Sequence, residues 1–192
     1  MHKSRLEAFS DGVIAIIITI MVLEMKAPHG AGWGEMWESV GPKFVSYVIS
    51  FLYVGIYWNN HHHLFQAVHQ VNGAVLWANL HLLFWLSLLP FCAAWMGENH
   101  FAAAPMGLYG FILLGAALAY FILTKALLRI HSLDSHLAKA LKRTGKEKFS
   151  ILLYVAAIAA SWLHGWISLA LYLVVALLWM VPDRRIEKML EV

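Results

Sequence analysis

Cysteine and charge are both scarce in this sequence. Only one of its 192 residues, Cys92, is a cysteine, and 13% of the residues are charged. A single cysteine excludes an intrachain disulfide framework and any multi-cysteine metal site. A hydrophobic content of 61% and a mean hydropathy of +0.66 exclude an ordinary soluble enzyme, a disordered chain and a nucleic-acid-binding domain. Six membrane spans would need ~120 mostly apolar positions, which is close to what 61% of 192 residues supplies.

Runs without Asp, Glu, Lys or Arg indicate where these spans lie. The run 44–97 is far too long for one span at a rise of roughly 1.5 Å per residue, and the polar stretch 66–73 divides it. The run 149–182 is also too long, and a break near His164 and Gly165 would make two short helices from it. We expect Pro90 to kink the third span. The expected spans of a single all-α domain over 1–192 are about 5–25, 43–65, 74–97, 105–128, 149–163 and 166–182.

Two basic segments predict the topology. One lies in the loop 139–148, and the other is the tail with Arg184, Arg185 and Lys188. The positive-inside rule places both on the cytoplasmic side, which requires an even number of crossings between them. We therefore expect six spans with both termini in the cytoplasm. The net charge of +3 and the pI near 9.0 reflect basic loops beside anionic lipid and not contact with nucleic acid.

The first expected span, 5–25, is poorly suited to lipid. Asp11 and Glu24 lie at or near membrane depth, where carboxylates are costly and usually face a bundle interior or water. No small-residue cleavage pattern follows the apolar segment, so we expect no cleavable signal peptide. At about 100° per residue one narrow stripe of this helix contains four residues: Gly12, Ile16, Ile20 and Leu23. The pattern alone leaves open an interior packing helix or a pore-lining helix, and we expect this helix at the centre of the assembly.

Residues 5–12 carry the most specific motif, R-x-x-x-F-S-D-G. Its defined positions are Arg5, Phe9, Ser10, Asp11 and Gly12, and Val13, Ala15, Ile16 and Thr19 follow. This segment resembles the signature of the transmembrane protein 175 family of potassium channels, and the chain length and six-span layout resemble its bacterial members. The resemblance implies a homotetramer in the bacterial plasma membrane, a potassium channel homologous to a lysosomal one. It also implies potassium as the permeating ion, lipid as the surroundings, no cofactor and no enzymatic activity.

In that family the first helix lines the pore, and rings of large aliphatic side chains form its constriction. Carried over from the motif, the tightest ring falls on Ile16, with Thr19 one turn further and Ile20 and Leu23 continuing the lining. The sequence contains no T-V-G-Y-G stretch of a carbonyl filter. A hydrophobic constriction gates by dewetting, and we expect a weak to moderate preference for potassium. Thr19 either offers a hydroxyl ring to the ion or donates back to the Ala15 carbonyl.

The resemblance further implies a polar network that joins the motif to the next two spans. In it Arg5, Phe9, Ser10 and Asp11 act as structural clamps and not as ion ligands. The candidate partners are Trp58, His61, His62, Asn79 and His81. Of the two neighbouring histidines we favour His62, and we expect His81 to be an interior residue that belongs to the same network.

Two other function classes fit less well. A proton- or cation-coupled carrier that uses Asp11 and the histidines as a relay is the main alternative, but it would be expected to show internal repeats or broken helices. A membrane enzyme with a metal held by His61–His63 and His69 is the other. Consecutive histidines on a helix point about 100° apart, so these three cannot bind one ion from one face. We expect no metal site.

Overall fold

The computed structural model describes residues 3–68, 70–130 and 145–180, which form helices and short connections. In chain order the helices are α1 (Ser4–Leu23), α2 (Trp33–Gln66), α3 (Gly73–Ser87), α4 (Leu89–Glu98), α5 (Ala103–Ile130), α7 (Lys146–Ser161) and α8 (Gly165–Met180). Within these residues, four stretches are long and apolar enough to cross a membrane: α1, α2, α3 together with α4, and α5. The prediction of an all-α membrane protein is confirmed.

Short sequence signals set several helix ends. Asn72 caps α3, because its side-chain oxygen accepts the Val75 N–H at 3.1 Å. The third expected span is interrupted at Leu88, and Pro90 lies in the first turn of α4, where its missing N–H costs nothing. The 149–182 run is divided as predicted, since α7 ends at Ser161 and α8 begins at Gly165.

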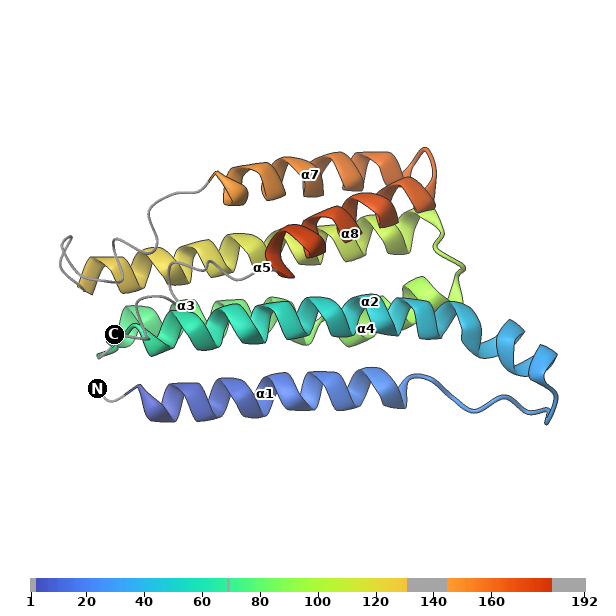
Figure 1. Ribbon diagram of the computed structural model, residues 1–192, viewed down its shortest axis with the longest axis horizontal. Helices are drawn as coiled ribbons and strands as arrows, with labels where there is room; N and C mark the ends of the chain where they lie inside the picture. Colours follow the sequence, from blue (N-terminus) through green and yellow to red (C-terminus); the bar gives the residue numbers. More distant parts are fainter. Residues whose placement is uncertain (1–2, 69, 131–144, 181–192) are drawn as a thin grey trace.

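α2 is longer than the charge-free run suggested. It begins at Trp33 instead of near residue 43, and its 34 residues correspond to about 51 Å of helix, against ~30 Å of hydrocarbon. Glu35 supports this early start by accepting the Gly32 N–H at 3.2 Å. Pro42 lies inside the helix, whose N-terminal part bends away from the rest (Figure 1). Charge-free runs locate the part of a helix that lipid can surround and not its ends.

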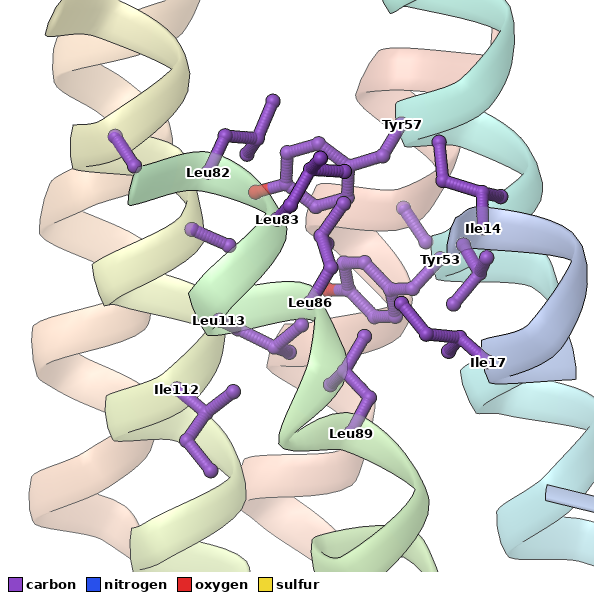
Figure 2. Close-up of a cluster of buried hydrophobic side chains, with 14 of the residues drawn as sticks. Ile14, Ile17, Tyr53, Tyr57, Leu82, Leu83, Leu86, Leu89, Ile112 and Leu113 are labelled. Atoms are coloured by element: carbon purple, nitrogen blue, oxygen red, sulfur yellow. The ribbon is translucent and has the colours of Figure 1, made fainter. Parts of the chain in front are cut away.

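The bundle places α1 at one edge and α7 at the opposite edge (Figure 1). α1 packs on α2, α3 and α4. Figure 2 shows the buried cluster between them, where Ile14 and Ile17 of α1 approach Tyr53 of α2 and Leu86 of α3. α1 is therefore held along one side by a packed aliphatic and aromatic core, while among the described residues its other side is largely exposed.

Candidate pore helix and polar network

The two sides of α1 differ sharply in burial. The packed side consists of residues three or four positions apart: Leu6, Ser10, Ile14, Ile17 and Met21. The stripe predicted from the sequence lies on the other side, where Ile16 is 58% exposed, Ile20 42% and Leu23 75%. The interpretation of this stripe as a core-packing surface is wrong for the single chain, because other residues of α1 contact the core. The large aliphatic side chains of the stripe remain to be covered by lipid or by another chain.

A groove of about 410 Å³ lies beside this stripe. Its α1 wall contains Ile16, Ile20 and Glu24, and its opposite wall contains Pro90 and Phe91 at the start of α4. The α3–α4 break thus lies at the depth of the predicted constriction. The groove is apolar along the stripe and has a carboxylate at the C-terminal end of α1.

Thr19 makes a hydrogen bond back to its own helix, and this bond does not prevent its oxygen from facing an ion. Its hydroxyl donates to the carbonyl of Ile16 at 2.8 Å, three residues back, and not to the carbonyl of Ala15. The residue is exposed on the same side as Ile16 and Ile20. Because the hydroxyl proton is used within the helix, the oxygen keeps only its acceptor capacity, which is the one a cation needs.

A buried chain of hydrogen bonds joins α1, α2 and α3. His61 Nε2 and Asn79 Oδ1 are 2.8 Å apart, and Asn79 Nδ2 donates to Ser10 Oγ at 2.9 Å. The Ser10 hydroxyl donates in turn to the Leu6 carbonyl at 2.8 Å. All three side chains are buried, so each bond replaces one that water would otherwise provide, and loss of a partner would be expensive. This chain fixes the rotation of α1 about its own axis.

A second contact, at the surface, holds the carboxylate of Asp11, the residue after Ser10. Trp58 Nε1 donates to Asp11 Oδ1 at 3.0 Å, and the Trp58 ring stacks on His62 with centroids 5.9 Å apart. His62 lies 2.8 Å from Gln66 through its Nε2. Trp58, Asp11 and His62 are all exposed, so this contact lies at the surface, beside the buried hydrogen bonds.

Two histidines differ from the expectation. His61, and not His62, occupies the buried chain, because it lies at helical spacing from the inward-facing Tyr53, Tyr57 and Leu64. That spacing is visible in the sequence, but which side of α2 faces α1 and α3 is known only from the structure. The expectation of an interior His81 is wrong: it is exposed, and its Nε2 accepts the Trp85 indole N–H at 3.0 Å. α3 is apolar on all sides, so its periodicity did not show which side faces lipid.

The remaining predicted residues are less constrained. Arg5 and Phe9 are exposed, and no hydrogen bond or ion pair joins the Arg5 side chain to any other described residue. Among the residues that the structure describes, no group of three His, Cys, Asp or Glu side chains is arranged to hold a metal ion. His69, most of the 139–148 loop and the basic tail lie outside the described residues.

Comparison with known proteins identifies close relatives. The family model described as endosomal/lysosomal potassium channel TMEM175 matches residues 5–90, the part that contains α1 and the network. A protein named potassium channel from Chryseobacterium sp. (strain P1-3) is 53% identical over 191 residues, which cover 100% of this chain and 99% of that protein. The crystal structure of a lysosomal potassium-selective channel TMEM175 homolog from Chamaesiphon minutus matches with a TM-score of 0.81 and 30% identity, over 94% of this chain and 97% of that one.

A more distant relative carries a different name. The human protein named endosomal/lysosomal proton channel TMEM175 is 32% identical over 116 residues, 55% of this chain but only 23% of that protein.

Proposed function

The chain belongs to the TMEM175 family of ion channels as one of its bacterial members, and we propose that it is a potassium-selective channel whose constriction is a ring of Ile16 side chains. As a member of this family it is an integral membrane cation channel and not an enzyme. The observation that carries the proposal is the exposed aliphatic stripe on a helix at the edge of the bundle.

One chain supplies one such stripe, so a pore requires several copies. Cyclic symmetry is the simplest way to surround an axis with identical helices. In the proposed homotetramer four copies of α1 line the pore with Ile16, Thr19, Ile20 and Leu23, and α2 to α8 pack outside. Assembly would gather side chains that are 42–75% exposed in the single chain around this axis.

Selectivity in such a pore comes from partial dehydration. A narrow ring of Ile16 side chains offers no ligand, so an ion crosses it only after losing part of its water. Potassium holds its water less tightly than sodium, and the ring therefore favours potassium modestly. The acceptor oxygen of Thr19, one turn further on, replaces some of the lost water. The outcome is a weak to moderate preference for potassium.

The polar network supports the pore indirectly. Ser10 and Asp11 point away from the stripe, and their bonds to Asn79 and Trp58 keep α1 in one rotational setting. A rotation of about 100°, one residue, would move Ile16 away from the axis. We therefore assign these side chains, with Arg5 and Phe9, a structural role and no contact with the ion.

We propose that the main permeating ion is potassium and not the proton. The relatives that match nearly the whole chain are named for potassium, whereas the human relative named for protons matches over 116 residues only. We place the channel in the bacterial plasma membrane with both termini in the cytoplasm. No cofactor is needed for this activity.

The test is ion flux into liposomes that contain the purified chain. We expect electrogenic potassium uptake that exceeds sodium uptake and is not saturated at low concentration. Absence of electrogenic flux from a well-folded oligomer would overturn the proposal and favour a coupled carrier that uses Asp11 and the histidines.

A further inference from the structure

Glu24 directly follows the candidate pore stripe. It is the C-cap residue of α1, one position after Leu23, and its side chain is exposed. It borders the same groove as Ile16 and Ile20. Its carboxylate therefore lies at the C-terminal mouth of the proposed pore, at the end of this groove.

A carboxylate at this position opposes the local preference of the helix. Free carbonyl groups give the C-terminus of a helix a partial negative charge, which favours basic residues there and disfavours acidic ones. The last turn of α1 contains no basic residue. The carboxylate of Glu24 and the carbonyl ends of α1 thus add to one negative field instead of cancelling.

Two other acidic side chains at this end of the molecule, those of Glu35 and Glu98, are already bonded. Lys43 Nζ pairs with Glu98 at 2.9 Å, and Glu35 accepts the Gly32 N–H. Lys43 also lines a small cavity with Glu24, but its ion pair is with Glu98. Among the described residues Glu24 makes no ion pair with a basic side chain.

We propose that Glu24 determines charge selectivity at the C-terminal mouth of the channel, an inference that rests on the pore function proposed above. In the tetramer four carboxylates and four helix C-termini surround the entrance. Charged rings of this sign raise the local cation concentration and repel anions. The Ile16 ring then selects among cations, and the Glu24 ring supplies cations and excludes chloride.

The experiment compares single-channel potassium conductance of Glu24→Gln and wild type at two ionic strengths. At ~0.01 M salt the Debye length is about 30 Å, and at ~1 M it is about 3 Å. We expect Glu24→Gln to lower conductance at least about twofold at low salt and to leave it unchanged at high salt. The potassium-to-chloride permeability ratio should fall in the same variant. Glu24→Asp, which keeps the charge, should retain wild-type conductance.

The matched control is Glu38→Gln, which removes the same charge from an exposed position on the first turns of α2, outside the groove. It should change low-salt conductance much less than Glu24→Gln does. Equal effects of the two variants would overturn the proposal, because the charge would then act only as general surface charge. An unchanged salt dependence in Glu24→Gln would also overturn it. A failure of the proposed pore function would give a different result. The wild type would then carry no current, or substitution of Ile16 would leave conductance and selectivity unchanged.

Discussion

Asn79 is the central member of the buried chain, and its truncation gives the sharpest test of that chain. Asn79→Ala removes the acceptor 2.8 Å from His61 Nε2 and the donor 2.9 Å from Ser10 Oγ. Ser10 still donates to the Leu6 carbonyl, so the His61 ring nitrogen bears most of the loss. One buried unsatisfied polar group costs about 1–3 kcal/mol. With the space left by the amide we expect a total of about 2–4 kcal/mol.

This free energy corresponds to a measurable shift in thermal stability. For a chain of this length 1 kcal/mol lowers the melting temperature by about 2–4 °C, so Asn79→Ala should lower it by roughly 5–15 °C. Melting of the purified protein in detergent, followed by size-exclusion chromatography after heating, measures the shift. Asn99→Ala is the control, because Asn99 is exposed and its side chain donates to the Trp95 carbonyl of its own helix. Its shift should stay within ~2 °C. Equal shifts for the two variants would refute the assigned role of the network.

Two further substitutions test other contacts. Asp11→Ala removes the acceptor of the Trp58 indole and should reduce the tetrameric fraction in light scattering while the remaining channels keep their potassium-to-sodium ratio. A stable tetramer with altered selectivity would contradict that assignment. Gly97→Ala would place a Cβ 2.7 Å from the Lys43 Cα and should destabilise the protein by about 1–3 kcal/mol in the same melting assay. Gly55→Ala is the control, because nothing lies within 4 Å of the new Cβ, and it should leave stability unchanged or slightly raised. Similar losses of stability for both variants would argue against the close α2–α4 packing.

The sequence predicted the features that depend on local chemistry. The break between α7 and α8 follows from a run too long for one span, and the interruption before Pro90 follows from the missing proline N–H. The exposed stripe of α1 was found by helical periodicity, since Ile16, Ile20 and Leu23 share one side in the structure as well.

Features that depend on packing between helices could not be predicted from the sequence. His61 and His62 are adjacent and chemically identical, and only the way α2 lies against α1 and α3 decides which one meets Asn79. His81 belongs to a helix that is apolar on all sides, so nothing local separated the lipid side from the core side. The early start of α2 at Trp33 depends on a cap outside the charge-free run and not on hydropathy.

The central claim is that the constriction lies on α1 at Ile16. The most direct measurement is the reversal potential with potassium on one side of the membrane and sodium on the other, for Ile16→Asn and Val22→Ala beside wild type. Val22 is also exposed but lies about 120° around α1 from Ile16. Ile16→Asn should hydrate the ring, raise the conductance and move the potassium-to-sodium ratio toward one, while Val22→Ala behaves as wild type. A wild-type reversal potential and conductance in Ile16→Asn would contradict the account and place the filter elsewhere.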